Sequence, residues 1–216
     1  MIFDLWETLV DWPRNDEHYA ALAAGLGVEL ERFREAWIAA RAGRELGPLA
    51  DGFRSVATEL AIENADIDAL VDLRREYTRT VLKPRPGVVD TLRELRGRGF
   101  RIGLISACTE DVPDVWRETE LADLFDDAVF SCSVGMSKPD PRIYELACER
   151  LGVRPAEAVF VGDGANDELA GADRVGMRAV LIHRPAEEPQ WDGLRDWPGP
   201  RITSIPEILE VVGPAS

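Results

Sequence analysis

Residues 2–9 read Ile-Phe-Asp-Leu-Trp-Glu-Thr-Leu, so a short apolar segment runs directly into the carboxylate of Asp4. An aspartate after a strand is ordinary by itself, because its side chain stabilises turns. Three later apolar segments, however, lead toward Ser106, Lys138 and Asp163. In an open parallel sheet the carboxyl ends of the strands lie on one side, where ligands bind. We therefore expect these four side chains to share one site.

The C-terminal part of the chain alternates between two hydrophobic patterns. From Val88 onward, amphipathic segments of helical spacing alternate with short apolar runs that are typical of strands. Strands are expected at 101–106, 128–131, 158–161 and 179–182, and helices at 88–98, 113–120, 141–151, 166–175 and 205–212. This alternation predicts an α/β fold, a Rossmann-like parallel sheet with helices on both faces.

Residues 11–83, between the first strand and this alternating part, carry no strand pattern. The spacing of their apolar residues predicts helices at 20–24, 29–42, 53–60 and 67–81. Proline-containing segments at 11–14 and 83–87 would connect this insertion to the rest of the chain. The sequence therefore predicts an α/β core of residues 1–10 and 84–216 and an all-helical insertion of residues 11–83.

The composition restricts the partners. The formal net charge of −15 disfavours nucleic acids and anionic membranes, because both attract basic surfaces. No apolar run reaches membrane-spanning length, and no basic-then-apolar signal precedes Asp4. The three cysteines lack metal spacing and the two histidines lie far apart, so we expect reduced thiols, no zinc and a cytoplasmic location. The expected partner is a small-molecule substrate, and the expected state is a monomer or homodimer.

Four motifs occur in an order and at a spacing that resembles the haloacid dehalogenase (HAD) superfamily of hydrolases. They are Phe3-Asp4-Leu5-x-x-Thr8-Leu9-Val10, Leu104-Ile105-Ser106, Lys138-Pro139-Asp140-Pro141-Arg142-Ile143-Tyr144 and Val161-Gly162-Asp163-Gly164-x-x-Asp167. Each motif is weak alone, but together they cover nearly the whole chain. The resemblance implies a HAD fold in which residues 11–83 form an α-helical cap over the site.

The resemblance also implies that Asp4 is a nucleophile. A carboxylate that attacks phosphorus forms an aspartyl-phosphate and divides one difficult displacement into two easier steps. Carboxylate and phosphate repel each other, and Mg²⁺ is commonly held between such groups. The implied metal ligands are Asp4, Asp163 and the backbone carbonyl of Trp6. Asp167 would orient metal-bound water, or it would only favour the N-terminus of the next helix.

Three further side chains belong to the implied site. Ser106 would donate its hydroxyl to a phosphate oxygen, and Lys138 would neutralise charge on the phosphate and on Asp4. Thr8, also near the phosphate, would support the Asp4 loop rather than react. Without the surrounding motifs, Ser106 would be interpreted as a turn residue and Lys138 as a solvated lysine.

Trp6 departs from the family pattern. Phosphatases of this family carry an aspartate there, which protonates the leaving alcohol and then activates water, and such help is worth about 10²–10⁴ in rate. An indole N–H cannot replace that acid. Glu7 is a poor substitute, because neighbouring loop residues point in different directions, and it occupies a position that the family commonly gives to glycine.

Three functions therefore remain open. The first is a Mg²⁺-dependent phosphatase acting on a small phosphorylated metabolite. The second is a 2-haloacid dehalogenase, because dehalogenases of the family carry a tyrosine at the position of Trp6, although they use no metal and lack the acidic motif of Asp163 and Asp167. The third is a catalytically impaired protein that binds a phosphate ligand. A phosphonate hydrolase of the family needs a cap lysine, but residues 1–82 contain none and Lys83 lies in the returning connection, so this function is disfavoured.

Several residues have no assigned role at this stage. Arg41 and Arg44 flank Gly43 and could contact a substrate anion or form a solvated helix end. Segment 185–200 is expected to be a loop of unknown role. Only three residues precede Asp4, fewer than a typical strand holds, so one hypothesis is that the native chain starts upstream of Met1.

Overall fold

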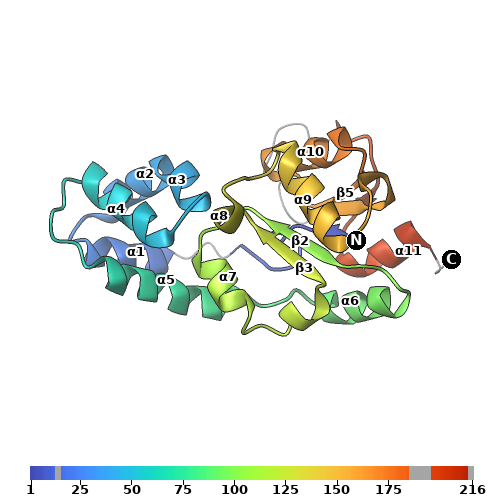
Figure 1. The fold of residues 1–216 in the computed structure, drawn as a ribbon. Coiled ribbons are helices and arrows are strands. Elements are labelled where there is room, and N and C mark those ends of the chain that lie inside the picture. The colour runs from blue at the N-terminus through green and yellow to red at the C-terminus, as the bar shows by residue number, and fades with distance from the viewer. Residues whose placement is uncertain (13–15, 185–195, 214–216) are drawn as a thin grey trace.

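The computed structural model describes residues 1–12, 16–184 and 196–213, and a parallel sheet forms its core (Figure 1). Within these residues the sheet has six strands in the order β3-β2-β1-β4-β5-β6. The strands are β1 Ile2–Phe3, β2 Gly103–Ser106, β3 Asp127–Phe130, β4 Val159–Gly162, β5 Arg178–Ile182 and β6 Arg201–Ile202. The chain passes from β1 outward to β3 and then returns to β4 on the other side of β1. Open α/β sheets bind ligands at such a reversal, here between β1 and β4.

Successive strand residues enter two hydrophobic clusters, one on each face of the sheet. In β1, Ile2 belongs to one cluster and Phe3 to the other. Helices α9 (Pro141–Leu151) and α10 (Glu168–Arg174) cover the face of Ile2, whereas α6 (Val88–Gly97), α7 (Asp111–Trp116) and α11 (Ile208–Val212) cover the face of Phe3. Because both faces are covered, the strands are mostly apolar rather than alternating, with charged residues at the starts of β3, β5 and β6.

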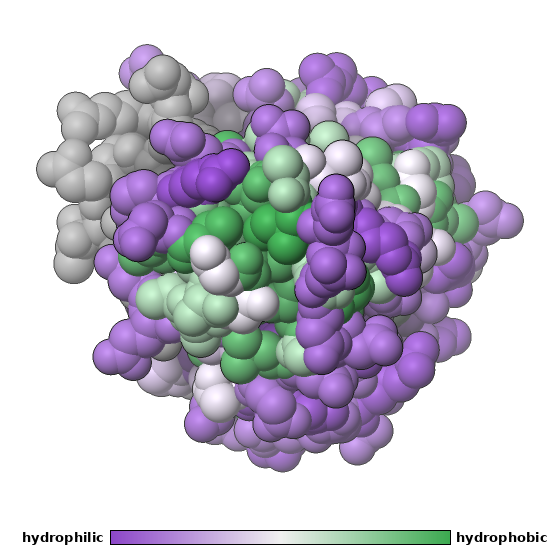
Figure 2. All heavy atoms as spheres, turned by 90° about the vertical axis from the view of Figure 1, so that its left-hand side faces the viewer, coloured by the Kyte–Doolittle hydropathy of each residue, from purple (hydrophilic) through white to green (hydrophobic). Residues whose placement is uncertain are grey.

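Helices α1 to α5 form a helical region of their own beside the sheet. They are α1 Asp16–Gly25, α2 Leu30–Ala39, α3 Arg41–Glu45, α4 Leu49–Glu59 and α5 Ile67–Val81. Phe33, Trp37 and Phe53 lie at the centre of a separate hydrophobic cluster within these helices. Figure 1 shows the helical region to the left of the sheet, with α5 reaching α7. Figure 2, which faces the end of this region, shows apolar residues surrounded by polar ones.

Both connections between the helical region and the remaining elements, here called the sheet region, meet at Arg85. Val10 on the outgoing connection forms an antiparallel bridge with Pro84 on the returning one. The buried guanidinium of Arg85 binds the carboxylate of Glu7 at 2.6 Å and that of Asp11 at 2.7 Å. It also donates to the backbone carbonyl of Glu7. Arg85 therefore fixes the loop after β1 and the two connections together.

The predicted α/β fold is confirmed, and the differences lie at short elements and helix ends. The expected helix 29–42 divides at Ala40 into α2 and α3. Strand β6 and helix α8 (Ser131–Val134) were not predicted, because segments of two and four residues are too short to show a period. Of the expected loop 185–200, residues 185–195 lie outside the described part. No helix of the described ranges is long and apolar enough to cross a membrane.

Candidate active site

Asp4 directly follows β1, next to the point between β1 and β4 where the order of strand addition changes direction. Its amide donates to the carbonyl of Val161 in β4 at 2.8 Å, so the end of β1 lies against the end of β4. Asp163 is the first residue after β4. The short strand β1 is paired on both sides, and this pairing sets the position of Asp4 at the bottom of a cavity. The two aspartates therefore come together because their strands are neighbours.

Lys138 lies in the loop before α9 and bonds two carboxylates. Its Nζ donates to Oδ1 of Asp4 and, at 2.6 Å, to Oε2 of Glu168. The lysine is 8% exposed. Burial by itself lowers the pKa of Lys138, but the charges of Asp4 and Glu168 outweigh it, so the net pKa is raised. Lys138 is therefore a firmly protonated cation in direct contact with Asp4.

Glu168, at the start of α10, is the third carboxylate of the site. Its Oε1 accepts a hydrogen bond from the amide of Gly164 at 3.0 Å, while Oε2 binds Lys138. Burial raises the pKa of Glu168, and the charges of Asp4 and Asp163 raise it further against the opposing effect of Lys138. Burial is thus the main cause of the raised pKa, and the two neighbouring carboxylates add to it.

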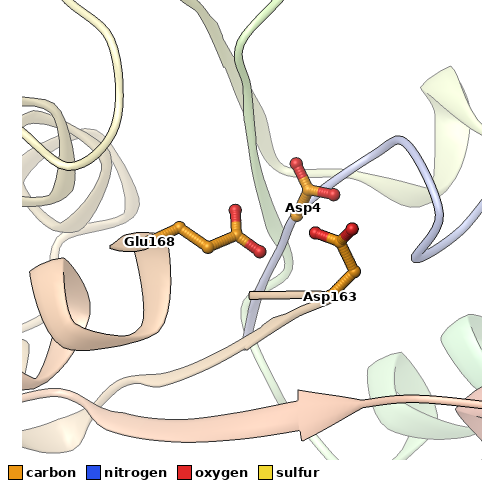
Figure 3. A group of neighbouring side chains, drawn as sticks. All are labelled: Asp4, Asp163 and Glu168. Carbon is orange, nitrogen blue, oxygen red and sulfur yellow. The ribbon is translucent and has the colours of Figure 1, made fainter. Parts of the chain in front are cut away.

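Asp4, Asp163 and Glu168 form a cluster whose carboxylate oxygens lie within 4.8 Å of one another (Figure 3). Three negative charges face the single positive charge of Lys138, which leaves a formal charge of −2. Carboxylate oxygens are the donors that Mg²⁺ prefers. The donor chemistry and the excess charge of the cluster therefore fit a divalent cation.

The absence of a side chain at Gly162 makes room for Glu168. A Cβ at position 162 would lie 2.1 Å from Oε1 of Glu168, which is far inside van der Waals contact. Gly162 is the last residue of β4, directly before Asp163. The end of this strand thus both carries one acid of the cluster and leaves space for another.

Asp167, for which the sequence analysis predicted a role beside the metal or at the helix N-terminus, is not one of the clustered carboxylates of the described residues. It is exposed and is absent from the cluster that the described residues form, whereas the adjacent Glu168 is 1% exposed. The cause is the backbone, because Asn166 and Asp167 have φ angles of 51° and 58° and delay the start of α10 until Glu168. A signal was available, since Glu168 lies one turn before the buried Ala172.

Ser106, at the end of β2, and Thr8, in the loop after β1, are both fully buried. Neither hydroxyl oxygen makes a hydrogen bond within the part of the chain that the structure describes. A buried hydroxyl without a partner is costly. Ser106 ends β2, the strand beside β1, and Thr8 belongs to the loop of Asp4, as the sequence predicts. Both residues thus belong to segments that reach the site, but neither lines the cavity.

Trp6 and Glu7 both line the cavity, but their side chains make different contacts. Trp6 lines the cavity, and its ring meets that of Trp12 edge-on, with the centroids 4.9 Å apart. Glu7 has a φ angle of 57°, the left-handed conformation that favours glycine. The Glu7 carboxylate binds Arg85 at 2.6 Å and accepts from the amide of Trp12 at 3.0 Å. Glu7 is therefore engaged in holding the loop.

The cavity above these residues has a volume of about 340 Å³ and extends to the helical region. Aromatic rings and arginines from the helices line it, and they include Tyr19, Trp37, Arg41, Arg44 and Arg74. The sequence analysis left Arg41 and Arg44 open. Arg41 is exposed, as at a solvated helix end, but Arg44 is buried. The volume suits a small metabolite.

Comparison with known proteins agrees with this arrangement. Residues 1–173 match the haloacid dehalogenase-like hydrolase family. A protein of Mycobacterium tuberculosis (strain CDC 1551 / Oshkosh) that is named a phosphatase is 30% identical over 213 residues, which cover 96% of this chain and 94% of that protein. The 2-haloacid dehalogenase of Pseudomonas syringae pv. Tomato DC3000 has a crystal structure that matches with a TM-score of 0.75 and 27% identity, covering 98% of this chain and 96% of that one.

A third relative is matched over a shorter region. Glyceraldehyde 3-phosphate phosphatase of Methanopyrus kandleri is 37% identical over 137 residues, which cover 61% of this chain. The match spans only 57% of that relative's length. The family match, by contrast, includes the whole helical region and every cluster residue. This chain therefore belongs to the haloacid dehalogenase-like hydrolase family and is a hydrolase with the HAD fold.

Proposed function

We propose that this protein is a Mg²⁺-dependent phosphatase that hydrolyses a small phosphorylated metabolite through an aspartyl-phosphate on Asp4. The cluster of Asp4, Asp163 and Glu168, with its formal charge of −2 beside Lys138, carries the proposal. Mg²⁺ would balance that charge and screen the carboxylates from the substrate phosphate. The phosphatases among the relatives support this choice.

The residues of the chain divide the remaining tasks. Asp4 attacks phosphorus, the bond from phosphorus to the leaving oxygen breaks, and water later attacks the aspartyl-phosphate to release phosphate and restore the carboxylate. Lys138, in contact with Asp4, offsets the charge that the phosphate brings. Ser106 and Thr8 would donate to the phosphate in this proposal, although both side chains are fully buried and neither lines the cavity. The metal would be held by the three carboxylates together with the backbone carbonyl of Trp6.

The helical region is proposed to act as a cap. In this proposal residues 1–10 and 84–216 form the core, and residues 11–83 form the cap. The cavity supports this division, because Asp4 and Lys138 line it from the sheet region and Trp37 and Arg44 line it from the helices. A substrate enclosed between the two regions would react away from bulk water.

Trp6 limits the substrates that such a phosphatase turns over quickly. The leaving alcohol receives no proton from position 6, and Glu7 is held by Arg85. A substrate whose leaving oxygen is already a weak base needs that proton least. We expect aryl phosphates to react faster than alkyl phosphates.

The test is hydrolysis of 4-nitrophenyl phosphate with Mg²⁺ and with a chelator, by the wild-type protein and by Asp4→Asn. We expect activity that requires both Mg²⁺ and Asp4. Asp167→Asn is the matched control, because it neutralises an exposed carboxylate outside the cluster. Equal rates for the wild-type protein and Asp4→Asn would overturn the proposal.

A second candidate function is 2-haloacid dehalogenation. Trp6 favours it, because an aromatic ring lines the cavity at the position where dehalogenases of the family carry one, and halide leaves without a proton. The Pseudomonas syringae structure also carries that name. Halide release from 2-chloropropionate in the presence of a chelator, lost in Asp4→Asn, would establish this function in place of the first.

A further inference from the structure

Arg44 differs from the two other arginines that line the cavity. Arg41 pairs with Glu45 at 2.9 Å, and Arg74 pairs with Asp111 at 3.1 Å. In the described ranges, no carboxylate lies within ion-pair distance of Arg44, although its exposed fraction is only 7%. Arg44 is thus a buried cation without a direct ion-pair partner among the described residues, and the charge of the neighbouring Glu45, which pairs with Arg41, offsets it only in part.

The contacts of Arg44 fix its position but do not balance its charge. Its Nε and Nη2 donate to the backbone carbonyl of Trp37 at 3.1 and 2.9 Å. Its guanidinium carbon lies 3.8 Å from the centroid of the Trp37 ring. Both partners are neutral. A guanidinium has five N–H donors, so the remaining donors of this immobilised group can still bind a ligand.

Burial lowers the pKa of Arg44 to about 10, so the group remains charged at neutral pH. A buried charge without a partner is strongly disfavoured. An anionic ligand in the cavity would remove this penalty and would meet a donor that is already held in place. Guanidinium groups bind carboxylates and phosphates through paired hydrogen bonds.

We propose that Arg44 binds a second oxyanion group of the substrate, a carboxylate or a phosphate, remote from the phosphoryl group that reacts at Asp4. This inference rests on the proposed phosphatase function. Arg44 and Asp4 line the same cavity of about 340 Å³, so one small molecule can reach both. The substrate class is then an acidic phosphomonoester, and Arg44 determines specificity for it.

The first test compares three substrates with the same carbon skeleton and uses the wild-type protein. Glycerol 3-phosphate has a neutral remote end, 3-phosphoglycerate has a carboxylate there, and glycerol 1,3-bisphosphate has a phosphate. We expect kcat/KM for one of the two acidic substrates to exceed that for glycerol 3-phosphate by about 10- to 100-fold, as charged hydrogen bonds allow. Equal values for all three would overturn the inference without any variant.

The second test removes the guanidinium. Arg44→Gln should bring the preference for the acidic substrate close to one, and Arg44→Lys should retain part of it because the charge remains. Arg54→Gln is the control, since Arg54 is an exposed arginine on α4 that pairs with Asp51 and does not line the cavity. If Arg44→Gln folds and keeps the full preference, Arg44 is not the specificity residue.

A binding measurement separates this inference from the proposed function. Calorimetry with the preferred acidic compound and Asp4→Asn needs no turnover, and adding Arg44→Gln should weaken that binding by about 10-fold or more. Aryl phosphate hydrolysis without any effect of Arg44 on binding would overturn the inference and leave the phosphatase intact. Binding that depends on Arg44 in a protein without phosphatase activity would support the role of Arg44 and overturn the phosphatase function.

Discussion

The sheet region and the helical region contribute groups of opposite charge to one cavity. At the ends of the strands, three carboxylates share one ammonium group, and negative charge is in excess. From the helices come aromatic rings and arginines, and one of those arginines, Arg44, is buried without a direct ion-pair partner in the part of the chain that the structure describes. Each region therefore carries an imbalance that a ligand of the opposite sign would relieve. A phosphorylated anion together with a divalent cation would relieve both.

The two regions also differ in how their charges are held. Lys138 and Glu168 bond each other directly, so the sheet region orders its own site. Arg44 is held by neutral groups, since it donates to the carbonyl of Trp37 and stacks on its ring. In the proposed function, the sheet region would carry the chemistry and the helical region would recognise the substrate.

The largest effect is expected from replacing Arg85, which joins the two connections between the regions. Arg85→Gln leaves Glu7 without its buried partner and removes the contact with Asp11. We expect the free energy of unfolding to fall by about 3 kcal/mol, the low end for a broken buried pair, because Arg184 also reaches Asp11 at 2.8 Å. Urea denaturation measures this loss. Arg93→Gln, at an exposed arginine, is the control, and an equal effect of both would contradict the role of Arg85.

The next change places a general acid at position 6, where phosphatases of the family carry an aspartate. Trp6→Asp should raise kcat for alkyl phosphates by about 100-fold, the lower end for general acid–base help. Aryl phosphates should gain much less, because their leaving group hardly needs a proton. The measurement is the ratio of the two rates in the variant and in the wild-type protein. A uniform gain would show that the bulk of Trp6, and not the missing acid, limits the reaction.

The adjacent acids at positions 167 and 168 provide a sharper comparison within the sheet region. Glu168→Gln should raise the Mg²⁺ concentration at half-maximal activity by about 10- to 100-fold, as for residues that position a metal. Asp167→Asn should change it by less than about two-fold, because Asp167 is exposed. A larger effect at Asp167 than at Glu168 would show that Asp167, the acid in the sequence motif, contributes more to metal binding.

How much the sequence reveals differs between the two regions for a physical reason. Helix α9 has the predicted bounds, because Asp140 caps it, Pro141 opens it and Gly152 ends it in a left-handed conformation. Asp4 and Asp163 are found from the sequence, because strand pairing brings the ends of apolar runs together. Glu168 is missed, since two residues with positive φ shift the start of α10.

In the helical region the sequence reveals the helices but not their contribution to the cavity. Arg41 and Arg44 are three residues apart in the same short helix, yet one is exposed and the other is buried. The difference depends on α4, where Gly52 allows the Arg44 side chain to approach: a Cβ at Gly52 would lie 3.0 Å from Cβ of Arg44. Contacts between helices of this kind have no local sequence pattern.

The smallest expected effect concerns acid. His18 is buried against Tyr77, with the rings stacked at 3.7 Å, and burial, assisted by Arg74, lowers the pKa of His18 to about 4. Because the unfolded histidine binds a proton near its ordinary pKa of about 6.5, its contribution to stability is present above that pH and is lost as the pH falls toward 4. Between pH 7 and 4.5 the loss amounts to about 2 kcal/mol.

His18→Phe keeps an aromatic ring beside Tyr77 and removes the titrating group. We expect its free energy of unfolding to depend less on pH than that of the wild-type protein, with the two curves converging on the acid side or crossing there. Urea denaturation at pH 7 and pH 4.5 measures the difference. Parallel curves for the two proteins would exclude His18 as the source of acid sensitivity in the helical region.

The missing side chain at Gly162 has a consequence for how mutations act on this molecule. Substitution by alanine adds one methyl group at the end of a strand, a change that parallel sheets usually tolerate. Here that methyl group would occupy the space of the Glu168 carboxylate and would release it from Lys138 and from the Gly164 amide. The damage would appear in the charge balance of the site, in a protein that still folds. A sequence comparison that scores only the acids and the lysine would therefore overlook an inactive relative.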